Sequence, residues 1–221
     1  ILDRKFKRLG LSFKAMEALT LSDKNETAMK SQVEIVSPFI IVKNISIDTD
    51  TQDMSHLSEE EHAKYFEIQD TKRKSQFYWG RYYLRYYLAE VLPYPAPLIP
   101  LSTDTNGKPY VVGHACYVSL THSHDKLGLV ISPSPCGIDI EKISPREHMQ
   151  AIMNKMFTQG DVDEIQKNPN PLNEFYKKWT LHEALFKMNQ NLGSLHKAEK
   201  EQLKVATHSQ ILEDFAMSYV F

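Results

Sequence analysis

The sequence predicts an α+β fold, in which strands and helices come in blocks instead of alternating strictly. Three observations lead to this prediction. β-Branched residues recur over 33–47, short strand-like runs cluster over 109–141, and long helical stretches cover about 70–92 and 171–190. The 221 residues are enough for one large domain or two small ones with a substantial core.

The first hundred residues read as an extension followed by one α+β half. Residues 1–32 are polar and basic, and we predict an N-terminal extension there. A strand is expected over 33–47, and Ser58 with Glu61 forms a capping box that opens a helix. The aromatic-rich helix over 70–92 ends before a proline-rich linker. We therefore place an N-terminal α+β half at 33–100 and a C-terminal α+β half at 101–221.

The C-terminal half begins with strands and continues with helices. Asn106-Gly107 is a strong turn signal, and strands are expected near 109–112, 115–120, 126–132 and 136–141. Ser144–Glu147 is predicted to open a helix, with serine as the N-cap and proline at the first helical position. Thr158 and Asp161 mark another helix start. A long helix is expected over about 171–190, and 202–221 contains strand-like pieces.

Composition narrows the classes of function and location. The net charge of -2 provides no bulk attraction to nucleic acid or to a membrane, and neither is expected as a partner. The two cysteines imply no disulfide framework, so we expect a reducing, cytoplasmic location. No apolar run is long enough to span a membrane. A monomeric state is expected.

Two carboxylates lie in the apolar run Gly137–Glu141. In a strand, alternate side chains share a face, so Asp139 and Glu141 point the same way. Like charges on one face repel each other unless a cation joins them. The alternative is a solvent-facing edge strand whose acidic side chains have no binding role.

A third carboxylate, Glu183, falls within the predicted apolar stripe of the helix over 171–190, formed by Leu172, Phe175, Tyr176, Trp179 and Phe186. A carboxylate in that position needs a partner, either Lys187 one turn later or a metal ion. The all-oxygen set Asp139, Glu141 and Glu183 suits Mg²⁺. Magnesium held by few carboxylates usually completes its shell with water and phosphate oxygens, which points to phosphoryl chemistry.

These two segments resemble the signatures of the surfactin-type 4'-phosphopantetheinyl transferases, G-[IV]-D-[IVL]-E and W-[ST]-x-K-E-[AS]-x-x-K. Gly137–Glu141 and Trp179–Lys187 occur in that order, separated by about forty residues. Weaker similarities support the resemblance, which covers about residues 60–190. They are Asn106–Pro109, Ser119–Ser123, and the pairs Arg73-Lys74 and Gly80-Arg81 in the helix over 70–92.

The resemblance implies two similar α+β halves related by a pseudo-twofold axis, with the metal site in the C-terminal half. It implies transfer of the 4'-phosphopantetheine moiety of coenzyme A to a serine of an acyl or peptidyl carrier protein, with release of 3',5'-ADP. Such carriers serve fatty acid, polyketide or nonribosomal peptide synthesis. Asp139, Glu141 and Glu183 would hold Mg²⁺, and Glu183 and Lys187 would act in catalysis. The residues implied in coenzyme A binding are Arg73, Lys74, Arg81, Lys108, His122 and His182.

Two departures from the family signature keep alternatives open. His182 stands where the family usually has lysine, and Met188–Leu192 replaces a glycine-rich stretch. One alternative is another Mg²⁺-dependent enzyme, which cleaves a phosphoanhydride or a phosphodiester. The other alternative is a non-catalytic homologue that binds carrier proteins. A zinc set is a further possibility, although its spacing fits no common zinc pattern: His114, Cys116, His122 and His124.

Overall fold

The structure is a computed structural model that describes residues 35, 37–46, 52–105, 107–191 and 205–221. The extension predicted over 1–32 lies outside these residues. The helices are η1 (Met54–His56), α3 (Glu59–Glu67), α4 (Thr71–Ala89), η2 (Ala96–Leu98), α5 (Met149–Met156), α6 (Gln159–Lys167) and α7 (Pro171–Asn191). The strands are β1 (Phe39–Asn44), β2 (Leu101–Thr103), β3 (Pro109–Val111), β4 (Tyr117–Ser123), β5 (Lys126–Ser132), β6 (Gly137–Lys142), β7 (Thr207–Leu212) and β8 (Phe215–Val220).

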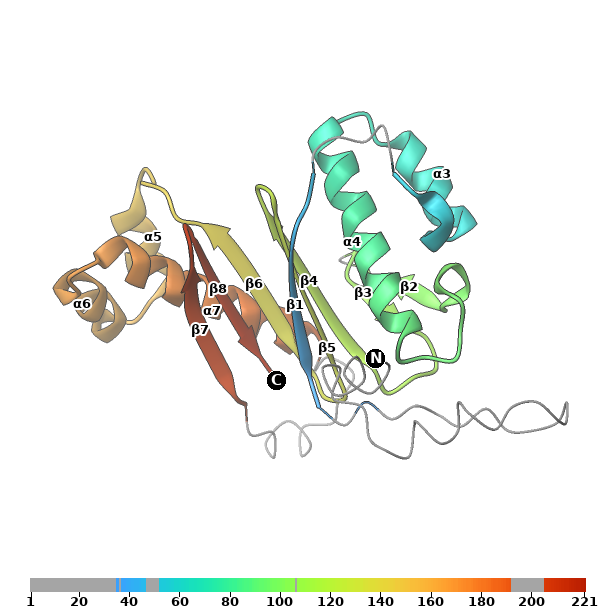
Figure 1. Cartoon of the computed structure of the whole chain (residues 1–221). Coiled ribbons are helices and arrows are strands. Elements are labelled where there is room, and N and C mark those ends of the chain that lie inside the picture. Colours follow the sequence, from blue (N-terminus) through green and yellow to red (C-terminus); the bar gives the residue numbers. More distant parts are fainter. Residues whose placement is uncertain (1–34, 36, 47–51, 106, 192–204) are drawn as a thin grey trace, which may run out of the picture.

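Antiparallel pairing connects the strands into two three-stranded sheets and one two-stranded sheet, so the predicted mixture of helices and strands is confirmed. The strand orders are β1-β5-β4, β6-β8-β7 and β2-β3. Leu129 of β5 lies opposite both Ile41 of β1 and Leu120 of β4. Asp139 of β6 lies opposite Ser218 of β8. Figure 1 shows the two larger sheets beside each other, with α4 beside one and α5 and α6 at the far end of the other.

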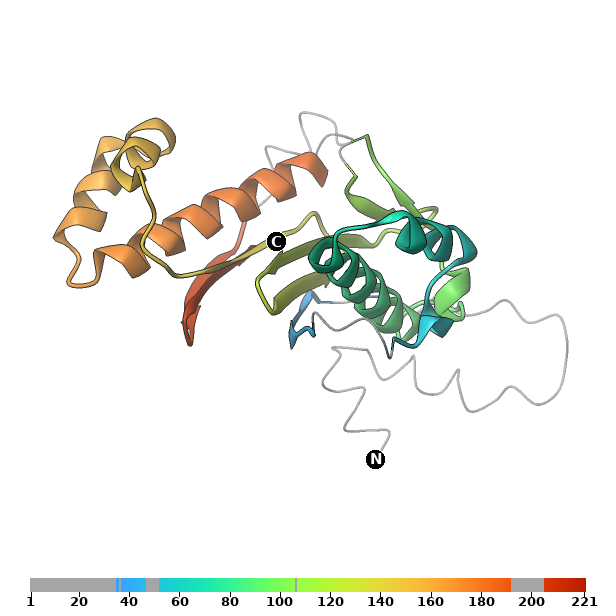
Figure 2. The ribbon, with the colours of Figure 1, turned by 90° about the horizontal axis from the view of Figure 1, so that it is seen from above.

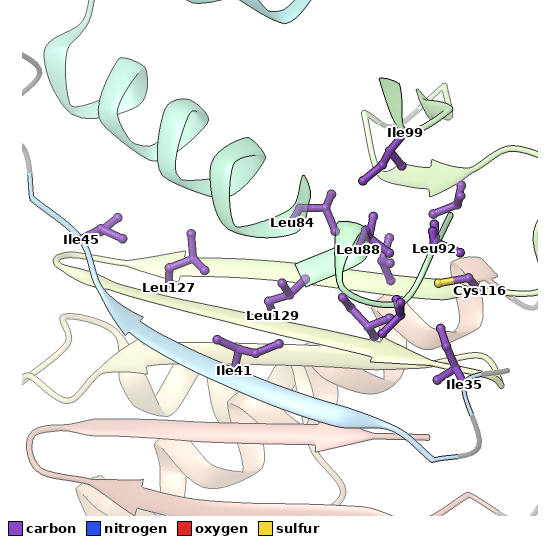
Figure 3. Packing of buried hydrophobic residues seen from close by; sticks show 14 residues of the cluster. Ile35, Ile41, Ile45, Leu84, Leu88, Leu92, Ile99, Cys116, Leu127 and Leu129 are labelled. Carbon is purple, nitrogen blue, oxygen red and sulfur yellow. The ribbon is translucent and has the colours of Figure 1, made fainter. Parts of the chain in front are cut away.

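The first core lies between α4 and the β1-β5-β4 sheet. Leu84 and Leu88 of α4 pack with alternate residues of β5, including Leu127 and Leu129, and all four are fully buried. Figure 3 shows these side chains filling the space between helix and strands. A β-carbon at Gly80 would lie 2.9 Å from Leu120 Cδ2, so glycine permits the close approach of α4 to β4.

The second large core joins the two sheets, and α7 covers the outer face of β6 and β8. Ile138 and Ile140 of β6 and Met217 of β8 pack into one buried cluster with Val130 of β5. Residues with the alternate spacing, such as Gly137 and Asp139, belong to the other face of β6, where α7 lies. Figure 2 shows α7 running along the β6-β8-β7 sheet.

The cores divide the chain differently from the boundary predicted at residue 100. That boundary would separate α4 from β4 and β5, although these elements share the first core with β1. The sheet changes between β5 and β6, after Ser132. The predicted boundary followed the prolines, but those residues form η2 and a turn that stays packed against α4.

Two of the three helix starts predicted from capping residues are confirmed. Ser58 with Glu61 and Thr158 with Asp161 both form complete capping boxes. The helix predicted to open at Ser144–Glu147 is wrong, because α5 begins only at Met149. Contacts with α7 hold this segment in a non-helical path: the Tyr176 hydroxyl donates to the Ser144 carbonyl, and Arg146 lies over the Trp179 ring.

A helix that crosses a membrane must be both long and apolar. None of the helices in the described part of the chain meets both requirements.

Candidate active site between β6 and α7

The two predicted motifs are in direct contact. A β-carbon added to Gly137 would lie 1.9 Å from the carbonyl oxygen of Ala184, so β6 and α7 approach as closely as backbones allow. The side chains that α7 turns toward the sheet are small at this level, since Ala184 and Thr180 are both fully buried. The two motifs, separated by about forty residues in the sequence, therefore meet in one site.

Most of the predicted apolar stripe of α7 is confirmed, because Phe175 and Tyr176 are buried and Leu172 and Trp179 pack against their cluster. Phe186 is 54% exposed, although it was expected in the apolar stripe. Beyond Tyr176, the buried positions continue in a four-residue repeat through Thr180, Ala184 and Met188. Glu183 lies beside this stripe and is partly buried. The prediction relied on hydrophobicity, whereas close packing against β6 requires small side chains.

Asp139 is the most enclosed carboxylate of the site, with 5% of its surface exposed. Its Oδ1 accepts hydrogen bonds from Thr121 Oγ1 at 2.9 Å and from Lys187 Nζ at 2.7 Å. Its Oδ2 is buried and has no hydrogen-bond partner. A buried carboxylate oxygen without a partner is costly, and it is a suitable ligand for a cation.

Glu141 lies two positions further along the same face of β6. Its Oε2 accepts a hydrogen bond of 2.9 Å from Ser123 Oγ on β4. Burial raises the pKa of Glu141 above its ordinary value, and the neighbouring charge of Asp139 adds to this increase, while Ser123 opposes it. A divalent cation near both carboxylates would relieve this repulsion.

Lys187 pairs with Asp139, and not with Glu183 as the sequence alternative suggested. Its ammonium group also donates to the carbonyl oxygen of Ile138 at 3.1 Å. Glu183 lies one turn earlier on α7, so the two side chains leave the same side of the helix. Within the described residues, no three His, Cys, Asp or Glu side chains are grouped so that they could hold a metal ion. The set of Asp139, Glu141 and Glu183 therefore stays a prediction.

Lys108 approaches the same end of α7 from the loop before β3. Its ammonium group donates to the carbonyl oxygen of Lys187. Burial lowers the pKa of Lys108 to about 8, and the charge of Lys187 contributes to the decrease, while Cys136 and Asp104 oppose it. Lys108 therefore loses its proton within the range of ordinary assay buffers.

This pKa gives a pH prediction. The resemblance implies that coenzyme A binds near Lys108, and a phosphate bound there would raise the pKa of Lys108, so its binding at pH 8 is expected to be accompanied by proton uptake. Calorimetric titrations in two buffers with different ionisation enthalpies measure this uptake. Lys108→Met should reduce it and weaken binding. Equal uptake in the variant would contradict a contact between Lys108 and phosphate.

The two predicted histidines differ in their surroundings. His122 on β4 keeps one side exposed, and desolvation on its other side is the largest cause that lowers its pKa; the charges of Lys187 and Lys72 lower the pKa further, while a backbone hydrogen bond and Asp139 oppose them. It therefore lies among basic groups contributed by both α4 and α7. His182 on α7 is partly buried, and its Nδ1 is buried without a hydrogen-bond partner.

The predicted basic residues of α4 turn partly toward α3. Lys74 Nζ lies 4.6 Å from the ring centre of Tyr65, and Arg81 Nε lies 3.6 Å from Glu61 Oε1. Arg73 is exposed in the first turn of the helix, where its backbone N–H donates to the N-cap Asp70. The coenzyme A contacts of these three residues stay predictions.

The zinc alternative is not supported. The residues it requires, His114, Cys116, His122 and His124, all lie in the described part of the chain, where no such group of ligands comes together. The His114 ring instead contacts the Tyr94 hydroxyl at 3.3 Å.

Sequence reasoning missed the roles of Thr121 and Ser123. Both lie in the segment Ser119–Ser123, but only His122 was assigned a function there. Their alternation with Leu120 and His122 could have indicated a polar face on β4. Nothing in the sequence shows that this face meets β6.

The site therefore combines the buried Asp139 and the half-buried Glu141 of β6 with Glu183 and Lys187 of the packed helix α7. Comparison with known proteins agrees: the model of the 4'-phosphopantetheinyl transferase superfamily matches residues 135–215. This match and the similar proteins below confirm the resemblance recognised from the two motifs.

Individual relatives carry the same family name. The chain is 30% identical over 112 residues to 4'-phosphopantetheinyl transferase psf-1 of Bacillus pumilus, covering 49% of this chain and 47% of that protein. It is 31% identical over 96 residues to 4'-phosphopantetheinyl transferase AcpT of Salmonella typhi, covering 42% and 50%. It is 27% identical over 135 residues to 4'-phosphopantetheinyl transferase gsp of Aneurinibacillus migulanus, covering 60% and 56%. The matches thus span about half the length of these relatives.

Proposed function

We propose that this protein transfers the 4'-phosphopantetheine moiety of coenzyme A to a serine hydroxyl of an acyl or peptidyl carrier protein, releasing 3',5'-ADP. The observation that carries the proposal is the ion pair of 2.7 Å between Lys187 and Asp139, which brings the two family motifs into one site. The relatives named above, all 4'-phosphopantetheinyl transferases, support it.

The acidic residues fit a hard divalent cation. Asp139 offers a buried, unpartnered oxygen, and Glu141 lies on the same face of β6. We propose Asp139, Glu141 and Glu183 as the residues that hold Mg²⁺. When bound, such an ion neutralises charge on the pyrophosphate that the serine hydroxyl attacks.

Other side chains have proposed roles that their positions support. Glu183 accepts the proton of the attacking serine, directly or through water, because a hydroxyl is a weak nucleophile without a base. Lys187 stabilises negative charge on the phosphates. The nucleotide half of coenzyme A lies between the two halves of the fold, near Lys108, His122 and His182, with Arg73, Lys74 and Arg81 as the proposed contacts from α4.

The halves repeat one arrangement of elements, and we propose that a pseudo-twofold axis relates them. The first comprises β1, α4, β4 and β5, and the second comprises β6, α7, β7 and β8. In each, a strand and a long helix precede a hairpin whose second strand pairs with the first strand. We further propose a cytoplasmic monomer whose partners are coenzyme A and a carrier protein of fatty acid, polyketide or nonribosomal peptide synthesis.

The test is incubation with coenzyme A, Mg²⁺ and an apo-carrier protein, followed by intact-mass measurement of the carrier. The proposal predicts a mass gain equal to one phosphopantetheinyl group, together with release of 3',5'-ADP. Nucleotide release without a carrier would instead indicate a phosphoanhydride- or phosphodiester-cleaving enzyme. Carrier binding without modification would indicate a non-catalytic homologue, for which His182→Lys is the variant to examine.

A further inference from the structure

The edge of β6 that does not pair with β8 is bonded to side chains of β4. The Ile138 N–H donates to Ser119 Oγ at 3.2 Å, and the Lys142 N–H donates to Ser123 Oγ at 3.2 Å. These hydroxyls replace a backbone partner for the edge of β6, which would otherwise hold unsatisfied donors. They also fix β6 relative to the first half of the fold.

Between these two bonds, β4 contacts both carboxylates. Thr121 Oγ1 donates to Asp139 Oδ1, and Ser123 Oγ donates to Glu141 Oε2, each at 2.9 Å. Ser119, Thr121 and Ser123 alternate along β4 and are all buried, so their hydroxyls form one polar row facing β6.

The direction of these bonds determines which carboxylate oxygens stay available. Ser123 Oγ accepts from Lys142 N–H, so its own proton is directed at Glu141. Thr121 and Lys187 both use Oδ1 of Asp139, which leaves Oδ2 buried and without a partner. Two like charges on one strand face would otherwise turn apart or become protonated.

We propose that Thr121 and Ser123 are positioning residues, which hold the Asp139 and Glu141 carboxylates in the orientation that accepts a divalent cation. The inference rests on the proposed function and deepens it, because it assigns part of the cation site to the first half of the fold. Hydrogen bonds to ligating carboxylates commonly change metal affinity by about 10–100-fold.

The test uses Mn²⁺ as the probe and measures its binding by electron paramagnetic resonance in the presence of coenzyme A. Thr121→Val keeps the shape of the side chain and removes the hydroxyl, and it should weaken Mn²⁺ binding about tenfold or more. Thr121→Ser restores the donor and should bind within about twofold of the original protein, as expected when the hydroxyl alone is responsible. Transfer by Thr121→Val should fall at limiting Mg²⁺ and recover at saturating Mg²⁺, a recovery that a merely structural role would not give.

Thr180→Val is the matched control. Thr180 is a buried threonine whose hydroxyl bonds to the Tyr176 carbonyl oxygen and to Ser218 Oγ, and to none of the three acidic residues. This variant should lose stability and keep its Mn²⁺ affinity. If Thr121→Val does not fold, Ser123→Ala decides the question by the same criterion.

Two results would overturn the inference: Thr121→Val binding Mn²⁺ as tightly as the original protein, or no Mn²⁺ binding by the original protein. The proposed function fails separately. If carrier modification is absent while Thr121→Val still weakens Mn²⁺ binding, the positioning role stands and the transferase assignment falls. If carrier modification is normal and Thr121→Val binds Mn²⁺ as tightly as the original protein, the transferase assignment stands and the positioning role falls.

Discussion

Asp139→Asn is expected to reduce phosphopantetheine transfer by roughly a thousandfold, because it removes the buried negative charge of β6 from the proposed cation site. The side chain keeps its shape, and its amide oxygen still accepts from Thr121 and Lys187. The fold should therefore persist. Steady-state transfer to a carrier protein and Mn²⁺ affinity measure the effect, and thermal melting checks the fold.

Asp214→Asn is the control with the same change of charge. Asp214 pairs with Lys142 at 3.3 Å on the protein surface, where ion pairs contribute little to stability. This variant should transfer at the normal rate. Near-normal transfer by Asp139→Asn would remove Asp139 from the catalytic account.

Gly137→Ala is expected to destabilise the protein by about 3 kcal/mol, a large effect for one methyl group. The added β-carbon would meet the Ala184 carbonyl oxygen at 1.9 Å, and backbone cannot turn away as a flexible side chain can. Relief requires α7 to move from β6, which carries Glu183 and Lys187 away from Asp139. Calorimetry should show a melting temperature lower by roughly 6–12 °C.

Gly160→Ala provides the comparison for this prediction. In α6, the nearest atom to the new β-carbon would be Thr158 Oγ1 at 3.8 Å, an ordinary contact. Alanine favours the helix more than glycine does, so stability should stay equal or rise slightly. If both variants melted at the same temperature, the close contact of β6 with α7 would be wrong.

Capping residues predicted the helix starts correctly where only neighbouring residues determine the start. Capping by Ser58 and Thr158 was readable because it involves neighbours in the sequence. The segment after Ser144 carried an equally good local signal and does not begin a helix. Contacts with Tyr176 and Trp179, far along the chain, outweigh the local preference there.

The candidate site was predictable as a list of residues and less so as an arrangement. The period of two in a strand placed Asp139 and Glu141 on one face of β6, and their side chains do share it. The partners of those carboxylates depend on which strand lies beside β6, and Thr121 on β4 could not be identified from spacing. Hydrophobicity also misplaced Phe186, because the close contact at Gly137 selects small residues on α7.

A crystal structure with coenzyme A and Mg²⁺ tests the central claim most directly. We expect one metal ion bound by oxygens of Asp139, Glu141 and Glu183 at about 2.0–2.1 Å, with the pyrophosphate completing its shell. Lys187 should then contact a phosphate. A pyrophosphate bound elsewhere, with Glu183 turned away from the two carboxylates of β6, would contradict the account.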